Sequence, residues 1–388
     1  MTEADTQPSA PKQPVIDACA FHEWRSSRDL LPFLSQGWQD LVLPPGSGVG
    51  AMHVTPGRWY ENPMGEKADE AYPEEGPPGS DYQLLREHLF GQGKRDRAVL
   101  AFDRGADVTA FGHVRAAMAF VQAINDWNQE VWLQRDSRLY GLALVLSQVP
   151  DAAAAEIRRV GTDPKIVGIA MGLNGMGRMY GHPAYHTIYE AASDLDLPVV
   201  IQVGTEAATT SLMPPVAGGM PATYAEYHMM RMHGAMSHIV SMITEGVFAR
   251  FSNLKLMVVG TGAMWVPSYL WRINYYHKRH HEMPWLKDVP SDTFRERIRI
   301  ATNSLESPRR PDDLIKVLST LPWIQESLTY ASGYPNRDYE EPEEQAARLP
   351  ADWHEAIFHK NAQDFYRWPE SAPGGGEAST GAETALAG

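Results

Sequence analysis

The chain has 388 residues, of which 43% are hydrophobic and 21% are charged, and its formal net charge is −14. A chain of this length can bury a large core in one or two domains. The acidic balance argues against nucleic acid as a primary partner, because phosphate contacts need clustered Lys and Arg. The single cysteine, Cys19, excludes an intrachain disulfide framework and a cysteine metal cluster.

The composition of the two chain ends predicts that neither end packs into the folded structure. Residues 1–13 read as a disordered leader without the apolar core of a signal peptide, and residues 369–388 read as a disordered tail. No apolar run approaches the roughly 20 residues of a membrane span. We therefore expect a soluble, cytoplasmic protein that does not bind membranes.

Between these ends, the sequence predicts strands that alternate with helices. Strands are predicted near residues 15, 97, 139, 166, 198, 254, 298 and 328. Helices are predicted at 84–90, 110–134, 151–160, 183–195, 229–250, 266–279 and 311–319, and short ones follow at 342–348, 351–358 and 359–366. This alternation favours a (β/α)8 TIM barrel over residues 14–368, rather than an open doubly wound sheet.

Two further features of the chain bear on this barrel. Residues 37–80 are rich in Gly, Pro and acidic residues and carry no sustained period. They predict an irregular N-terminal insertion, either a lid or a docking arm for a partner. His228, His233 and His238 lie at five-residue steps, which spreads them around a helix and argues against a shared metal site.

Several short motifs, in a fixed order, carry a resemblance to a known family. They are N-D-W at 125–127, D-S-R-L-Y-G at 136–141, G-V-F-A-R-F-S-N-L-K at 246–255, W-V-P-S-Y-L-W-R at 265–272, S-G-Y-P-N-R-D at 332–338 and N-A-Q-D-F-Y at 361–366. Together they resemble the amidohydrolase-related TIM barrels. The similarity is to the branch that holds aminocarboxymuconate-semialdehyde decarboxylase and related nonoxidative decarboxylases and hydrolases.

The resemblance implies a Zn²⁺ or similar divalent ion at the carboxyl ends of the strands, where it lowers the pKa of bound water to about 7. The ligand positions of the family fall here on Cys19 and Phe21, Gln202, Gly260 and Gly333. Phe and Gly offer no donor, and a Gln carboxamide is a poor substitute for imidazole on zinc. We interpret the five positions as vestigial. We predict no metal or other cofactor on this chain, and a family metal would belong to a partner subunit.

No catalytic residue is assigned by this reasoning, although some side chains near the vestigial positions are candidates. His22 and Glu23 follow the second of these positions. His22 is expected to face the mouth or a loop, and a register shift is the alternative that would turn it inward. Cys19 is a candidate nucleophile or a core cysteine. If the chain is an enzyme in its own right, Gln202 is a further candidate near the chemistry. Asn336 and Asp338 are expected as neighbours at the barrel mouth, with Asp338 bracing a loop.

Three functions remain open at this point. We favour a catalytically degenerate subunit, inactive alone, which pairs as a hetero-oligomer with an active, metal-bearing paralogue. The resemblance also implies that a homodimer is an alternative assembly. The second function is a hydrolase or nonoxidative decarboxylase in its own right, which acts on a small carboxylated or cyclic substrate with a relocated metal site or none. The third is a small-molecule binding protein.

Overall fold

The computed structural model describes residues 14–43, 54–175, 177–211, 219–279 and 283–368. The predicted leader and tail lie outside the described residues. No helix among the described residues is both long enough and apolar enough to cross a membrane.

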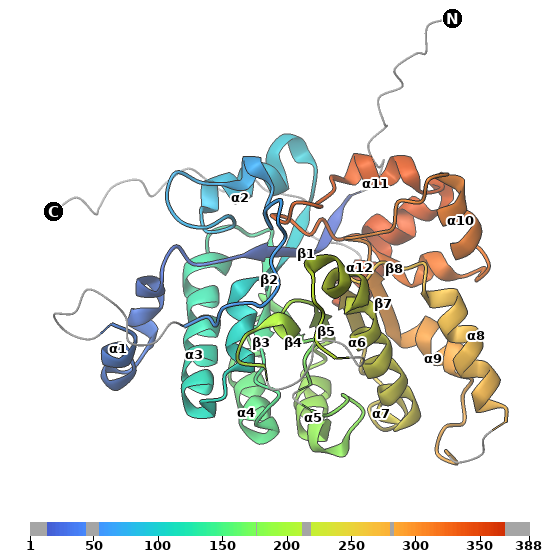
Figure 1. The fold of residues 1–388 in the computed structure, drawn as a ribbon, viewed down its shortest axis with the longest axis horizontal. Helices are drawn as coiled ribbons and strands as arrows, with labels where there is room; N and C mark the ends of the chain where they lie inside the picture. Colours follow the sequence, from blue (N-terminus) through green and yellow to red (C-terminus); the bar gives the residue numbers. More distant parts are fainter. Residues whose placement is uncertain (1–13, 44–53, 176, 212–218, 280–282, 369–388) are drawn as a thin grey trace, which may run out of the picture.

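Eight parallel strands form one sheet whose spatial order follows the chain (Figure 1). They are β1 (Ile16–His22), β2 (Arg97–Phe102), β3 (Leu139–Leu144), β4 (Ile166–Gly172), β5 (Val199–Gln202), β6 (Leu256–Val259), β7 (Ile298–Ala301) and β8 (Leu328–Thr329). The chain just after β8 returns to β1, because Ala18 N–H donates to the Tyr330 carbonyl over 2.9 Å. The prediction of a (β/α)8 barrel is therefore confirmed.

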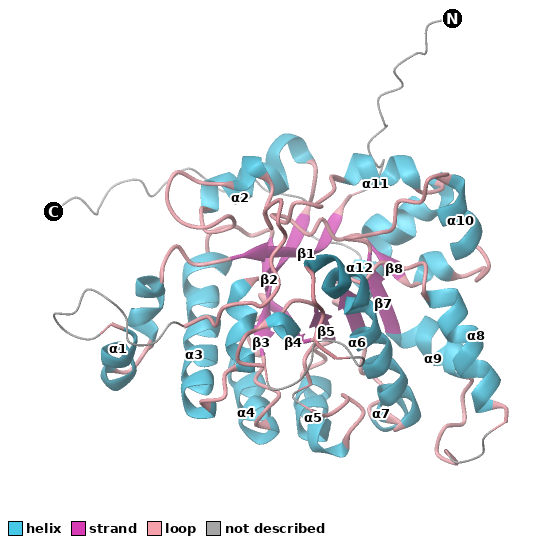
Figure 2. Ribbon diagram, viewed as in Figure 1, coloured by secondary structure: helices cyan, strands magenta, loops and turns pink. Residues whose placement is uncertain are grey.

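The strands are almost wholly apolar because both of their faces are buried, as expected for a parallel sheet covered by helices. Helices surround the strands on the outside of the barrel (Figure 2). They are α1 (Gln36–Val42), α2 (Tyr82–Phe90), α3 (Val114–Trp127), α4 (Pro150–Val160), α5 (His186–Asp194), α6 (Tyr224–Thr244), α7 (Val247–Arg250), α8 (Val266–His277), α9 (Pro290–Arg297), α10 (Asp312–Leu318), α11 (Pro342–Arg348) and α12 (Asn361–Phe365).

One predicted helix, at 229–250, differs from the structure. The chain forms α6 from Tyr224 and then the separate α7, because Gly246 between them has a φ of +73° that an α-helix does not contain. At the start of α6, the Thr223 side chain accepts a hydrogen bond from Glu226 N–H and caps the helix. This earlier start adds a turn to α6 at the barrel mouth.

Residues 54–71, within the predicted insertion, form a strap across the carboxyl ends of the strands. At one end, Trp59 N–H donates to the Ala207 carbonyl after β5 over 2.9 Å. At the other end, Ala68 N–H donates to the Pro335 carbonyl after β8 over 3.1 Å. The strap thus joins two loops that lie on different sides of the barrel mouth.

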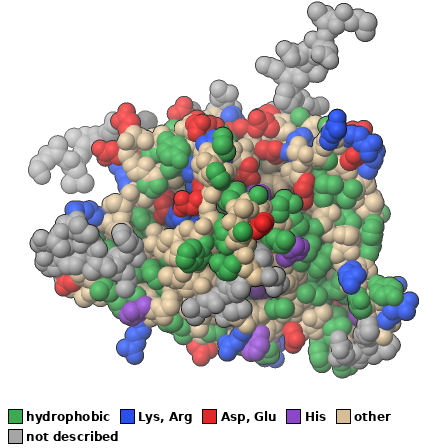
Figure 3. Space-filling view, viewed as in Figure 1, with side chains coloured by type: hydrophobic (Ala, Val, Ile, Leu, Met, Phe, Trp, Pro, Cys, Tyr) green, Lys and Arg blue, Asp and Glu red, His purple; other side chains and the backbone are tan. Residues whose placement is uncertain are grey.

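The molecular surface has regions of mixed charge and a region that is mainly apolar. Acidic and basic side chains are interspersed on one face, while hydrophobic side chains gather on the side where α8 lies (Figure 3). Three aromatic side chains of α8 are exposed there, namely Trp271, Tyr275 and Tyr276.

Candidate functional site

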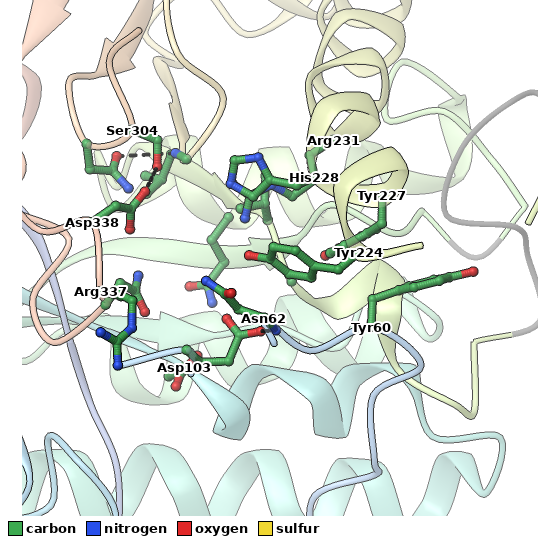
Figure 4. Close-up of a pocket in the computed structure, with 18 of the residues that line it drawn as sticks. Tyr60, Asn62, Asp103, Tyr224, Tyr227, His228, Arg231, Ser304, Arg337 and Asp338 are labelled. Carbon is green, nitrogen blue, oxygen red and sulfur yellow. Dashed lines mark hydrogen bonds between the residues drawn. The ribbon is translucent and has the colours of Figure 1, made fainter. Parts of the chain in front are cut away.

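A cavity of about 450 Å³ opens at the carboxyl ends of the barrel strands, beneath the strap (Figure 4). Its walls come from the ends of β1, β2, β5 and β6, the loops after β7 and β8, the first turns of α6, and the strap. This is the end of a TIM barrel at which active sites are built. The volume suits a small molecule.

The α6 wall of the cavity carries a cation, Arg231, that has no anionic partner among the residues that the structure describes. Arg231 Nη2 lies 2.6 Å from His228 Nε2, and no described carboxylate lies within ion-pair distance of Arg231. Its Nε is buried and has no hydrogen-bond partner among the described residues. Burial, together with the charge of Arg231, lowers the pKa of His228 to about 4. His228 is therefore a neutral imidazole that accepts a hydrogen bond from the guanidinium.

Tyrosines line the same wall, and they differ in what their hydroxyl groups contact. Tyr227 donates to Glu206 over 2.8 Å and Tyr60 donates to the Pro221 carbonyl over 2.7 Å, while their two rings stack at 5.0 Å. The hydroxyl of Tyr224 points into the cavity without a hydrogen-bond partner among the described residues (Figure 4). Burial raises the pKa of Tyr224, and Arg231 opposes this shift, so the phenol is protonated at neutral pH.

The opposite wall is an ion-pair cluster that ties the strap to the barrel. Asp103, which follows β2, lies 2.5 Å from Lys67 and 3.7 Å from Arg58. Burial would raise the pKa of Asp103, but these two strap cations outweigh it and hold the pKa at about 2. Arg58 also pairs with Asp107 over 2.7 Å. The charges on this wall are thus matched within the protein, unlike the charge of Arg231.

A model of a protein family described as Amidohydrolase matches residues 19–368. The chain belongs to the amidohydrolase family. Among curated relatives, it is 24% identical over 278 residues to a gamma-resorcylate decarboxylase of Rhodococcus jostii, which covers 65% of this chain and 80% of that protein.

Solved structures agree on the fold. A 5-carboxyvanillate decarboxylase from Sphingomonas paucimobilis superposes with a TM-score of 0.61 at 21% identity, over 91% of this chain and 99% of the other. An amidohydrolase from Mycobacterium avium subsp. paratuberculosis superposes with a TM-score of 0.67 at 16% identity, over 92% of this chain and 100% of the other. A 2,6-dihydroxybenzoate decarboxylase from Rhizobium gives a TM-score of 0.59 at 18% identity, over 92% and 99%.

The five positions that family resemblance gives to a metal do not form a ligand set here. Phe21, Gln202 and Gly260 line the cavity, whereas Cys19 and Gly333 lie behind its lining and meet through the hydrogen bond of Gly333 N–H to the Cys19 carbonyl. Burial raises the pKa of the Cys19 thiol well above its usual value. Among the described residues, no three His, Cys, Asp or Glu side chains converge in a way that would hold an ion.

The two glycines are closed to larger side chains by their conformation and their neighbours. Gly260 has a φ of +82°, and a Cβ atom there would lie 2.6 Å from Val203 Cγ2. Gly333 has a φ of +74°, and a Cβ atom there would lie 3.1 Å from Asn303 Cβ. The residues present therefore do not fit the family's divalent ion.

The other candidate residues are placed mainly in the core. His22 Nδ1 donates to the Ala101 carbonyl over 2.8 Å, its Nε2 lies 2.9 Å from the Asn128 side-chain amide, and burial lowers its pKa to about 4. Glu23 accepts hydrogen bonds from the backbone N–H groups of Trp24 and Gly105, and burial beside Asp103 raises its pKa to about 8. Neither side chain lines the cavity.

The two expected mouth neighbours do line the cavity. The side-chain oxygen of Asn336 accepts from Lys67 over 2.7 Å, which ties the loop after β8 to the strap. Asp338 accepts from the Ser304 hydroxyl over 2.8 Å and so braces the loop after β7 against the loop after β8 (Figure 4).

Sequence reasoning considered His228 only as a member of a shared metal site, and it missed the other three residues of the α6 wall. Tyr224, Tyr227, His228 and Arg231 have the spacing i, i+3, i+4 and i+7, which places them on one face of a helix. This spacing is present in the sequence. It was hidden because the predicted helix began at 229, after three of these four residues.

Proposed function

We propose that this chain is an enzyme in its own right, a nonoxidative decarboxylase that acts in the mouth cavity on a small cyclic carboxylate, without a metal at the family's ligand positions. The observation that carries this proposal is the guanidinium of Arg231, which faces the cavity without a carboxylate partner among the described residues. Decarboxylases among the similar proteins support the reaction class. Decarboxylation is favoured over hydrolysis because the described residues offer no ligand set for a metal-activated water.

Arg231 would bind the carboxylate of the substrate. A guanidinium pairs with a carboxylate through charge-assisted, often bidentate hydrogen bonds, and the buried Nε is a donor available for one of them. The neutral His228 holds Nη2 from the other side over 2.6 Å and adds no competing charge. Partial exclusion of water strengthens the attraction between the two charges.

Tyr224 would supply the proton that replaces carbon dioxide. When the bond between ring and carboxylate breaks, carbon dioxide leaves and the electron pair remains on the ring carbon. That carbon takes the proton of the Tyr224 hydroxyl, and the phenolate formed is stabilised by the nearby charge of Arg231 until water returns the proton. A carboxylate subsite and a proton donor on one helix face are what this step needs.

The test uses 2,6-dihydroxybenzoate, the substrate named for one structural neighbour, with the purified chain after chelator treatment and again with added Mn²⁺. We expect product formation without added metal. Arg231→Gln should weaken binding of this carboxylate roughly 10- to 100-fold, whereas binding of the neutral 2,6-dihydroxybenzamide should not change. Tyr224→Phe should lower kcat while leaving substrate affinity within a factor of about 3.

Activity that appears only with stoichiometric metal would contradict this mechanism, and so would an affinity that Arg231→Gln leaves intact. Arg231→Lys provides the matched control because it keeps the charge but loses the planar fork. Its affinity for 2,6-dihydroxybenzoate should therefore lie between the affinities of the wild type and the Gln variant.

A second candidate function is the degenerate subunit that supports an active, metal-bearing paralogue. The observation that favours it is the absence of a metal-ligand set at the five family positions. Mixing the purified chain with a metal-bearing amidohydrolase from the same genome tests it. An increase in the activity of that partner, with no turnover by this chain alone, would favour the subunit role over the independent enzyme.

A further inference from the structure

We infer that the place given to a metal in the family is, in this chain, a neutral hydrogen-bonding subsite that binds a hydroxyl group of the ligand between the amides of Gln202 and Asn303. This inference rests on the proposed function for the identity of the cavity, and it adds the second recognition point of the substrate. Three observations carry it. The groups involved are uncharged amides, in contrast to the charged guanidinium of Arg231.

Gln202 supplies a hydrogen-bond acceptor with a fixed direction. Its side chain lies at the end of β5 and is 2% exposed. The amide Nε2 donates to the Phe102 carbonyl, and the opposite orientation of the amide would place two oxygens against each other. Gln202 lines the cavity, and its Oε1 is buried and has no hydrogen-bond partner among the described residues. A buried acceptor without a donor is costly, so a ligand that brings a donor gains affinity.

Asn303 supplies the complementary donor. It follows β7, is 5% exposed and lines the same cavity. Its Oδ1 accepts from Gly260 N–H over 3.2 Å, which fixes the amide. No hydrogen bond of Nδ2 exists among the described residues, and this group remains available to a ligand.

The glycines at two of the family's ligand positions and the amide pair are linked by packing and hydrogen bonding. Asn303 fits beside Gly333 because the glycine lacks the Cβ that would lie 3.1 Å from Asn303 Cβ. The Gly260 backbone holds the Asn303 oxygen, and Val259, just before it, pairs with Gln202 across the sheet. The two amides therefore flank the end of β6, with Gln202 on β5 at one side and Asn303 after β7 at the other, and both line the cavity.

A hydroxyl group suits this pair because it both donates and accepts a hydrogen bond. It would donate to Gln202 Oε1 and accept from Asn303 Nδ2. Two neutral amides give little affinity for a divalent ion, which prefers carboxylate, imidazole or thiolate ligands. Together with Arg231, the pair defines the ligand class as a small cyclic carboxylate that carries a ring hydroxyl.

The experiment measures binding by calorimetry to the full chain after chelator treatment. The carboxylate probes are benzoate, the three hydroxybenzoates and the matching methoxybenzoates, which accept but do not donate. The neutral probes are phenol and anisole. We expect at least one hydroxybenzoate to bind roughly 5- to 100-fold more tightly than its methoxy counterpart, and phenol to bind more tightly than anisole.

Two variants distinguish the loss of the amide subsite from a loss of the folded structure. Gln202→Leu removes the acceptor, and Asn303→Asp keeps the Oδ1 bond to Gly260 but removes the donor. Each should abolish the preference for hydroxyl over methoxy, while benzoate affinity in Gln202→Leu stays within a factor of about 3 of the wild type. Thermal unfolding shows whether each variant folds, and Gln202→Met replaces Gln202→Leu if it does not.

The outcomes distinguish the two proposals. Benzoates that bind without a hydroxyl preference, or with one that both variants leave unchanged, would overturn the amide subsite but not the carboxylate site. A preference for phenol over anisole that depends on Gln202, without binding of any carboxylate, would support the amide subsite and overturn the proposed function. If no probe binds, both proposals fail.

Discussion

Substitution of Gly260 by alanine should cost the protein several kcal/mol of stability, because this position after β6 is closed by packing and by backbone conformation. A φ of +82° disfavours an L residue, and the new Cβ would lie 2.6 Å from Val203 Cγ2. The left-handed backbone costs about 1–2 kcal/mol and overpacking about 1–3 kcal/mol, so the free energy of unfolding should fall by about 2–5 kcal/mol. Any metal-binding side chain at this position would begin with the same Cβ.

Urea unfolding of the single and double variants measures this cost. Val203→Ala removes the contacted methyl group, and a double-mutant cycle with Gly260→Ala should recover the overpacking part but not the backbone part. Gly112→Ala is the matched control, since no atom lies within 4 Å of its Cβ and its φ is not positive, and it should change stability by less than about 0.5 kcal/mol. A Gly260→Ala variant as stable as the wild type would refute the closure of this position.

Other measurements test the buried thiol and the strap. The Cys19 thiol should not react with a thiol reagent in the native protein and should react fully after unfolding, because it is buried and its pKa is raised. Rapid native labelling would contradict this. For Asp103, the folded pKa of about 2 lies below the ordinary 3.8, so stabilisation is complete above about pH 4 and is lost as the pH falls toward about 2. Lys67→Met should lower the free energy of unfolding at neutral pH by about 2 kcal/mol at most. The decrease of this free energy on acidification should become smaller by the same amount. An unchanged pH profile by urea unfolding would show that Lys67 does not hold the Asp103 charge.

The barrel was predictable because each strand is a short apolar run that needs burial on both faces, and eight such runs alternate with helices. The assignment of the family's ligand positions to Cys19, Phe21, Gln202, Gly260 and Gly333 came from the resemblance and stays a prediction. Sequence reasoning did not place His22 in its contacts with Ala101 and Asn128, because those partners are 79 and 106 residues away. Likewise, an alignment of ligand positions gives no indication that Asn303 occupies the space beside Gly333.

The strap was beyond prediction for a different reason. Its residues have no hydrophobic period, and its attachments are hydrogen bonds to the loops after β5 and β8, which a local pattern does not encode. The local sequence around Arg58 and Lys67 does not indicate a distant acidic partner for either side chain. The structure instead pairs both with Asp103 at the mouth.

The manner in which the strap is attached has a consequence for how this protein can diverge. Besides the ion pairs of Arg58 and Lys67 with Asp103, main-chain N–H and carbonyl groups fasten its ends, as in the bonds from Trp59 to Ala207 and from Ala68 to Pro335. Such bonds form with almost any side chain at these positions except proline at a donor. Between the fastened ends, Tyr60, Asn62 and Glu66 face the cavity. Mutations at these three positions can therefore change the shape and polarity of one cavity wall while its anchors persist, and related chains can acquire new ligands through this segment without rebuilding the barrel.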